Sequence, residues 1–134
     1  MIEVRAEKGA DLTIFTSRGK LTAGELEAKI RAFYESGPTA LVLWDFSDAD
    51  ISALSTAEIQ ALAQLTGSLS RQRTRGRTAL IAPEALTYGL GRMYQTNAEI
   101  AESTTQTMIF RTAEEAWAWL GFKNGDPAAL RRGR

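Results

Sequence analysis

The chain has 134 residues, of which 16 are basic and 16 acidic, and it contains neither cysteine nor histidine. This length suits one domain, and a hydrophobic fraction of 44% with a charged fraction of 24% is that of an ordinary globular protein. The two missing residue types exclude disulfides, zinc–thiolate sites and the mechanisms that need a histidine base or a cysteine nucleophile. We therefore expect a protein that is not an enzyme, with no cofactor and no metal site.

Charge and hydropathy limit the location of the protein and its partners. A formal net charge of zero argues against a whole-domain attraction to nucleic acid or to anionic membranes. The segment that follows Met1 lacks the basic and apolar regions of a signal peptide. The longest apolar runs have about five residues, whereas a membrane span needs roughly 20. We expect a cytoplasmic protein that is not an integral membrane protein and does not bind nucleic acid.

The first part of the chain predicts a β-hairpin. Apolar residues alternate with polar ones over 2–6 and again over 12–14, which is typical of strands with one buried face. Gly9, Ala10 and Asp11 between them predict the turn. Continuous apolar runs farther along the chain predict central strands that are buried on both faces. The three remaining strands are predicted over 40–44, 78–82 and 107–110.

Helix starts are the most specific local signals in the sequence. Three segments carry the capping-box pattern, in which a Ser or Thr is followed three residues later by Glu, and these N-caps are Thr22, Ser55 and Thr112. The first two boxes are also flanked by apolar residues at the hydrophobic-staple positions. A fourth helix is predicted to begin at Pro83, because proline suits the first helical position.

The predicted order of elements is β-β-α-β-α-β-α-β-α. This is an α/β fold with a five-stranded, mostly parallel sheet, an N-terminal antiparallel hairpin strand and about four helices. Right-handed crossover connections make strands two to five parallel. We assign residues 1–123 to a single domain. Residues 124–134 contain glycine, proline and three arginines and are predicted to form a flexible C-terminal tail.

Several short motifs, in this order of elements, resemble those of a known family. They are Leu43-Trp44-Asp45-Phe46-Ser47, Ala79-Leu80-Ile81-Ala82-Pro83, Tyr88-Gly89-Leu90-Gly91-Arg92-Met93 and Glu115-Ala116-Trp117-Ala118-Trp119-Leu120. Over roughly residues 2 to 122 the chain resembles the SpoIIAA-like family, the fold that STAS domains (anti-sigma-factor antagonists) share with the lipid-binding module of Sec14-type proteins. It is most similar to the bacterial STAS/SEC14-like branch, most of whose members have no assigned activity.

This resemblance implies a non-catalytic interaction or regulatory module. Such a module would act through protein partners or by self-association. The alternative is a domain that binds a small apolar molecule or a lipid, as the Sec14-type module does. Both functions remain open on the sequence alone.

Ser55 is a candidate phospho-acceptor by resemblance. Antagonist STAS domains carry an Asp-Ser-Ser-Gly-like stretch whose second Ser is phosphorylated by a partner kinase, and of the matching positions 53–56 only Ser55 keeps its type. A phosphate there would lie at the positive end of a helix. The alternative is that Ser55 is an N-cap that pairs with Glu58 and has no other role.

A second candidate site surrounds the predicted fourth helix. Gly89 and Gly91 allow a ligand or another backbone to approach closely, and Arg92 offers a guanidinium suited to carboxylate or phosphate. The alternative is packing of the helix on the sheet, with Arg92 paired to an acid. The complete set of candidate ligand or partner contacts is Asp45, Tyr88, Gly89, Gly91, Arg92, Met93 and Tyr94.

Four arginines precede the fourth predicted strand. Arg71, Arg73, Arg75 and Arg77 alternate with other residues and form a candidate anion patch for an acidic partner or a lipid headgroup. A solvated loop is the main alternative. Nucleic acid is disfavoured because no aromatic residue is interleaved with the arginines.

The apolar strands conflict with the expected topology. Right-handed connections that run in one direction place their helices on the same face of the sheet, so the other face should be partly open. The runs 40–44 and 79–82 are nevertheless apolar throughout, and a bare apolar face of roughly several hundred Å² is rare on a monomer. One of the chain's own helices, a second copy or a ligand must cover this face. We predict a homodimer or a ligand groove that involves the less-covered face and the helix of Tyr88 to Tyr94.

Overall fold

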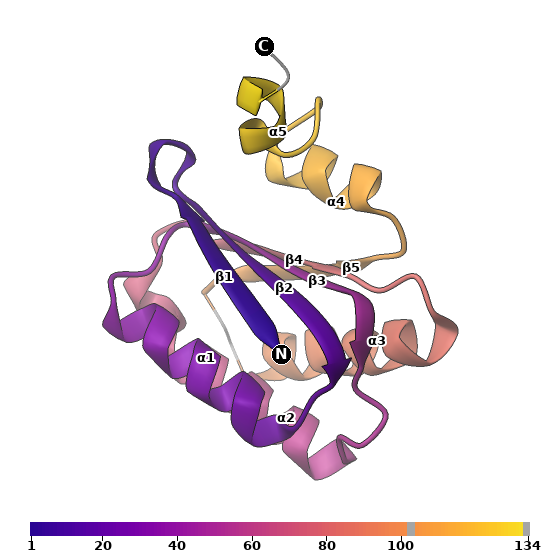
Figure 1. The fold of residues 1–134 in the computed structure, drawn as a ribbon. Coiled ribbons are helices and arrows are strands. Elements are labelled where there is room, and N and C mark those ends of the chain that lie inside the picture. Colours follow the sequence, from indigo (N-terminus) through magenta and orange to yellow (C-terminus); the bar gives the residue numbers. More distant parts are fainter. Residues whose placement is uncertain (102–103, 133–134) are drawn as a thin grey trace.

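The computed structural model describes residues 1–101 and 104–132. Five strands form one sheet in the order β1-β2-β3-β4-β5 (Figure 1). β1 is antiparallel to β2, and the remaining neighbours are parallel. The α/β fold, the order of the five strands and the first four α-helices, and the strand directions are therefore confirmed.

The elements follow the chain with short connections. The strands are β1 (Ile2–Glu7), β2 (Leu12–Lys20), β3 (Leu41–Asp50), β4 (Arg77–Ile81) and β5 (Gln106–Phe110). The α-helices are α1 (Ala23–Glu35), α2 (Thr56–Leu69), α3 (Ala85–Ile100), α4 (Ala113–Leu120) and α5 (Pro127–Arg132). Two 3₁₀ turns, η1 (Lys8–Ala10) and η2 (Ser70–Gln72), complete the order. Within the described ranges, no helix is both long and apolar enough to cross a membrane.

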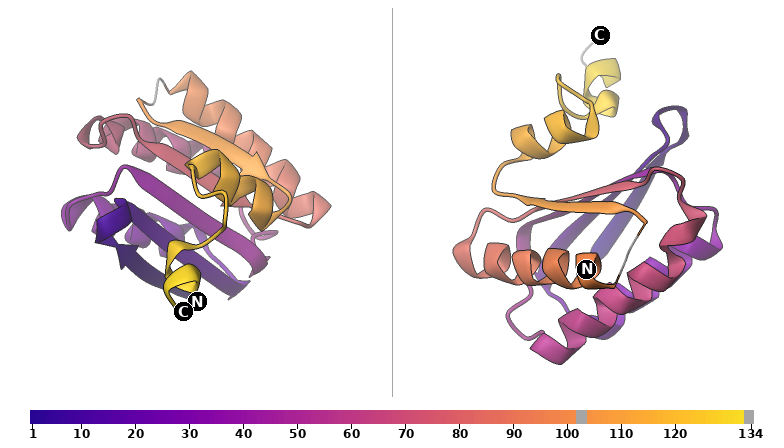
Figure 2. Two further views of the ribbon diagram at one scale, coloured as in Figure 1. Left: turned by 90° about the horizontal axis from the view of Figure 1, so that it is seen from above. Right: turned by 180° about the vertical axis from the view of Figure 1, so that it is seen from behind.

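Helices cover both faces of the sheet, in unequal numbers. α1, α2 and α3 lie on one face, whereas α4 and α5 lie on the other (Figures 1 and 2). Successive residues of a central strand serve the two layers in turn: Trp44 packs with the first group of helices, and Leu43 packs with Trp117 and Leu120 of α4. The continuous apolar runs of β3 and β4 are thus explained by two separate cores.

This arrangement corrects the predicted groove. α4 covers the middle of the face that was expected to be bare, where Leu43 is 2% exposed. α3, which carries Tyr88 to Tyr94, packs on the opposite side of the sheet. The two parts of the predicted groove therefore do not meet, and self-association remains a prediction.

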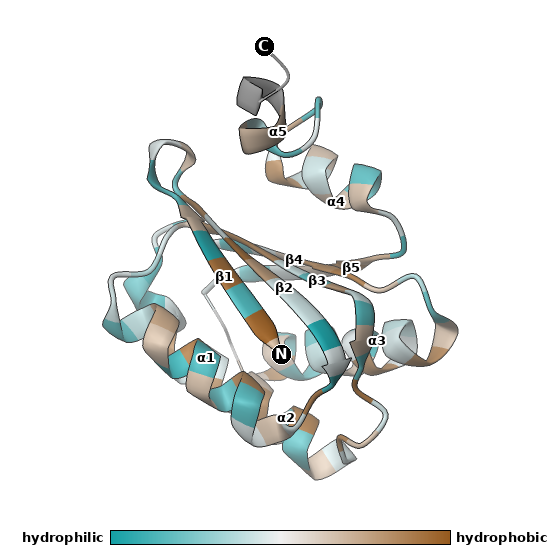
Figure 3. Cartoon of the chain, viewed as in Figure 1, coloured by the Kyte–Doolittle hydropathy of each residue, from teal (hydrophilic) through white to brown (hydrophobic). Residues whose placement is uncertain are grey.

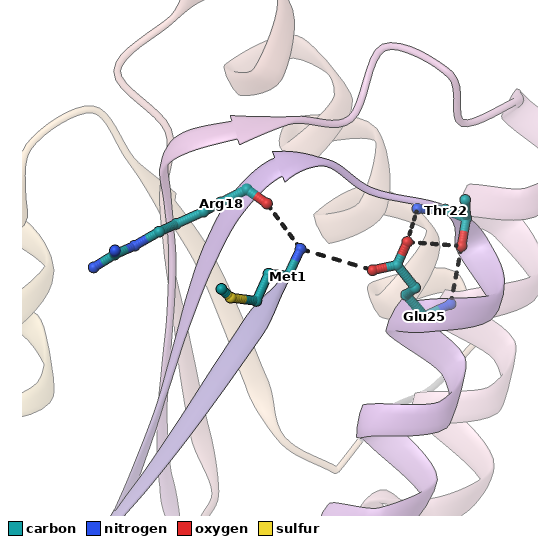
Figure 4. A network of polar contacts seen from close by, with 4 residues as sticks. All are labelled: Met1, Arg18, Thr22 and Glu25. Atoms are coloured by element: carbon teal, nitrogen blue, oxygen red, sulfur yellow. Dashed lines mark hydrogen bonds and ion pairs between the residues drawn. The ribbon is translucent and has the colours of Figure 1, made fainter.

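Two predicted capping boxes are present in full. Thr22 Oγ1 accepts a hydrogen bond from the Glu25 N–H at 3.2 Å, and Ser55 Oγ accepts one from the Glu58 N–H at 3.1 Å. The Glu25 carboxylate also lies 3.8 Å from the amino group of Met1, which donates to the Arg18 carbonyl at 2.9 Å (Figure 4). These contacts connect the start of α1 with the beginning of the chain.

Some boundaries differ from the prediction. β3 continues to Asp50 because its polar second half still pairs with β2, past an irregularity between Thr16 and Arg18. α3 begins at Ala85 with Glu84 as N-cap, rather than at Pro83. Polar and apolar residues alternate along β1 (Figure 3), but the burial does not follow this alternation, because Ile2 is buried whereas Val4 is 50% exposed.

The segment predicted to be a tail contains a helix. Residues 127–132 form α5, and the Asp126 carboxylate accepts a hydrogen bond from the Ala128 N–H at 2.9 Å. Arg5 of β1 donates to Asp126 and also to Glu7, the latter at 2.6 Å. Residues 133 and 134 of the predicted tail lie outside the described residues.

Candidate functional site

The core between the sheet and helices α1, α2 and α3 contains a cavity of about 70 Å³. Its wall combines Trp44 and Leu80 from the sheet with aliphatic side chains from all three helices, such as Ile30, Leu62 and Leu90. Tyr94 and Thr78 contribute the polar groups of this wall. The cavity is therefore suited to an apolar occupant.

A second cavity, of about 30 Å³, adjoins the first. The two share four lining residues, namely Ile30, Trp44, Thr78 and Tyr94. The second cavity is more polar, because its wall also includes Tyr34, Thr66 and Arg73. We treat the two cavities as one site with an apolar end and a polar end.

Arg73 is the charged group at the polar end. Only 4% of its surface is exposed. Its guanidinium donates four hydrogen bonds, at 2.8–3.1 Å, to the carbonyls of Thr39, Ala40 and Arg77 and to the Thr78 hydroxyl. It also lies 5.5 Å from the centre of the Phe33 ring. Among the described residues, no carboxylate forms an ion pair with Arg73.

The four arginines of the predicted anion patch do not share one surface. Arg77 donates to the Trp119 carbonyl at 2.7 Å and to the Leu120 carbonyl at 3.5 Å, which attaches it to the end of α4. Arg73 is buried, as described above, and Arg77 is half-buried. Only Arg71 and Arg75 are exposed. The prediction of a surface patch of four arginines is thus corrected, because only two of the four are exposed.

Two tyrosines line the polar end, and their hydroxyl groups differ in hydrogen bonding. The Tyr94 hydroxyl donates to Thr66 Oγ1 at 2.7 Å, and Thr66 donates in turn to the Leu62 carbonyl at 2.9 Å. Burial raises the pKa of Tyr94 to about 12, although the bond to Thr66 opposes this shift. The Tyr34 hydroxyl is buried and has no hydrogen-bond partner within the described part of the chain.

The candidate residues of α3 divide between the core and the solvent. Tyr94 and Gly91 line the apolar cavity, and Met93 is half-buried against the same core. Gly89 and Arg92 are exposed, and Arg92 has no ion pair within the described residues. The predicted pairing of Arg92 with an acid is therefore absent there.

Asp45 and Tyr88 lie apart from the cavity. Asp45 pairs with Thr16 and Ile81 in register, which places its side chain on the α4 face of the sheet. Its carboxylate accepts a hydrogen bond from the Ser47 N–H at 2.9 Å. The Tyr88 ring stacks under Arg111, with 4.5 Å between the guanidinium carbon and the ring centre. Neither residue therefore belongs to the same site as Tyr94.

Ser55 is exposed at the start of α2, and its hydroxyl caps the helix. Its backbone N–H donates to the Glu58 carboxylate at 2.9 Å, so both halves of the box are made. The capping interpretation is thus confirmed, and phosphorylation remains a prediction. In the part of the chain that the structure describes, no group of three acidic residues is placed to hold a metal ion.

Most residues of the polar end were not predicted from the sequence. Tyr34 could have been found, because it follows Leu26 and Ile30 at intervals of four residues on the apolar face of α1. No local signal marks Arg73, since two of its carbonyl partners, on Thr39 and Ala40, precede β3 and are more than 30 residues away in sequence.

Comparisons with known proteins add no further assignment to this site. No protein-family model matches the chain, and a search of the curated proteins found no match. The two adjoining cavities and the groups that line them are therefore the features that bear on function.

Proposed function

We propose that this chain is a cytoplasmic, non-catalytic binding module of the SpoIIAA-like type that holds a small, mainly apolar molecule in its core. The observation that supports this proposal is the pair of adjoining cavities between the sheet and helices α1, α2 and α3. It agrees with the Sec14-type function that the resemblance implies. Action through protein partners or by self-association stays a prediction.

The energetic cost of an empty cavity favours an occupant. Protein interiors are packed as densely as organic crystals. At roughly 24 cal/mol per Å³, an unfilled cavity of about 70 Å³ would lower the free energy of unfolding by on the order of 2 kcal/mol. A ligand that fills the space would restore those contacts. The apolar wall also keeps water from being a good substitute.

Benzene is the first probe, because it is a small apolar molecule of the kind that enters dry apolar cavities in proteins. We expect benzene titrated into the ¹⁵N-labelled protein to shift the NMR signals of Leu80, Leu90 and Tyr94, and to raise the melting temperature. Shifts that are confined to exposed residues, with no rise in melting temperature, would contradict the proposal.

A variant that fills the site provides the matched test. Ile30 lines both cavities, so Ile30→Phe should block benzene binding. Ile100→Phe adds the same ring at a position that is 73% exposed and should leave binding unchanged. In parallel, organic extraction of protein purified from its native host, followed by mass spectrometry, should identify a bound small molecule.

A further inference from the structure

We propose that the natural occupant is an organic acid, whose apolar body fills the larger cavity and whose carboxylate lies beside Arg73 and Tyr34. This inference rests on the proposed function and adds the chemical class of the ligand. It depends on three properties of the polar end: an uncompensated charge, unused hydrogen-bonding groups and a position just below the surface.

The first property is the charge of Arg73. A guanidinium stays positively charged at physiological pH, and a buried charge is costly unless an opposite charge lies beside it. Carbonyl and hydroxyl oxygens accept the hydrogen bonds of Arg73, but these groups are neutral. Among the described residues, no carboxylate is paired with it. A ligand carboxylate would supply the missing negative charge.

The second property is the set of unused hydrogen-bond donors. A guanidinium has five N–H groups, and the four bonds of Arg73 leave one N–H on Nη1, the nitrogen that also donates to Thr78. The hydroxyl of Tyr34 is a second donor without a partner, on a side chain that is 5% exposed. Both residues line the smaller cavity. A carboxylate accepts hydrogen bonds at both of its oxygens and can satisfy the two donors together.

Other occupants fit the polar end less well. An ammonium group would repel Arg73, and an alcohol would leave its charge uncompensated. A cavity of about 30 Å³ can hold a water molecule, which could bond to Tyr34 but would also leave the charge without a partner. Of these four groups, only the carboxylate provides both the charge and the acceptors.

The third property is the position of Tyr34 between the core and the surface. Tyr34 also lines a surface groove of about 170 Å³, together with Arg31 and Glu35 of α1 and Leu69 and Gln72 near the end of α2. The polar end of the site thus lies close to the solvent. An amphipathic acid could therefore keep its charged group near the surface while its apolar part enters the larger cavity.

Three probes of similar bulk test the proposal at pH 7: hexanoate, hexylammonium and benzene. We expect NMR titration to show that hexanoate binds at least about tenfold more tightly than hexylammonium, with shifts at Trp44, Thr78 and Tyr94. Equal affinities for hexanoate and hexylammonium would overturn the proposal. If benzene still binds in that case, the proposed function stands without the acid; if benzene fails to enter the core, the proposed function itself is contradicted.

Tyr34→Phe is the decisive variant, because it removes one unsatisfied hydroxyl and should not unfold the protein. We expect it to weaken hexanoate about tenfold while changing benzene affinity by less than about twofold. Tyr88→Phe deletes a hydroxyl outside the cavities and should leave hexanoate affinity unchanged. The double variant Arg71→Gln/Arg75→Gln should also leave hexanoate affinity unchanged. If the double variant lost hexanoate binding, the proposal would be overturned in favour of surface binding. Unchanged hexanoate affinity in Tyr34→Phe would overturn it in the same way.

Discussion

Gly91 of α3 lies so close to Ile109 of β5 that a β-carbon added to Gly91 would be 2.5 Å from the Ile109 Cδ1 atom. This contact explains why a glycine occurs in the middle of a helix, where it lowers helix stability by roughly 1 kcal/mol relative to alanine. At Gly89, two residues earlier, the same added carbon would have no atom of the described residues within 4 Å, apart from those of its chain neighbours and its own helix backbone. The two glycines of the Gly-Leu-Gly motif therefore differ in role.

The first prediction compares these glycines. Gly89→Ala should raise the free energy of unfolding by about 0.5–1 kcal/mol, because the position is helical, exposed and unobstructed. Gly91→Ala should give no gain, since the added methyl forces Ile109 to repack and overpacking costs about 1–3 kcal/mol. Chemical denaturation with urea measures both variants. Equal stabilisation by the two substitutions would show that α3 does not pack on β5 as described.

The second prediction concerns the buried arginine. Arg73→Gln should lower the free energy of unfolding by about 3 kcal/mol, because it removes the hydrogen bonds that the buried guanidinium donates to three carbonyls and to the Thr78 hydroxyl. Arg71→Gln, at an exposed position two residues earlier, should change it by less than about 0.5 kcal/mol. Urea denaturation of both variants provides the comparison. If both variants changed the free energy of unfolding by similarly small amounts, Arg73 would be exposed to solvent rather than buried.

The third prediction concerns the N-cap of α2. Ser55→Ala should lower the free energy of unfolding by about 1 kcal/mol, because the Glu58 N–H loses its acceptor. Ser55→Asp should be nearly neutral, since aspartate also caps helices. Thermal or urea unfolding of the two variants distinguishes these outcomes. A large and equal loss in both would contradict the capping role. Phosphate found on Ser55 in protein from the native host would instead support the signalling function.

Local signals in the sequence were sufficient for most of the fold. The boxes at Thr22 and Ser55 involve residues three apart, so the pattern contains the whole interaction. The parallel directions of strands two to five were predicted from right-handed β-α-β connections. The position of α4 could not be predicted in this way, because no strand follows it and the handedness rule applies only between two parallel strands.

The candidate site was less accessible to prediction. Tyr94 was identified from its motif, whereas Arg73 looked like one member of an exposed run. Its burial depends on carbonyls just before β3 and at the start of β4 that come together only in the folded protein. The cavity likewise exists only between packed elements, and hydropathy patterns do not reveal how completely their side chains fill the space.

The last prediction concerns stability in alkaline solution. The pKa of Tyr94 is raised from 10.0 to about 12 in the folded protein because its phenol is buried. The folded state therefore keeps the proton when the unfolded chain has already lost it. The stabilisation from the neutral phenol is complete below pH 10 and is lost as the pH rises toward 12. In this range the free energy of unfolding should fall by about 1.4 kcal/mol per pH unit from Tyr94.

Urea denaturation at several pH values between 8.5 and 12 measures this slope, and Tyr94→Phe isolates the contribution of Tyr94 from that of lysines and other groups. At pH 8 the variant should be less stable by about 1 kcal/mol, because Thr66 loses a hydrogen bond. Above pH 10 its stability should decline less steeply than that of the unsubstituted protein, so the two curves approach each other. Parallel curves for Tyr94→Phe and the unsubstituted protein would mean that the Tyr94 phenol ionises as readily in the folded state as in the unfolded chain.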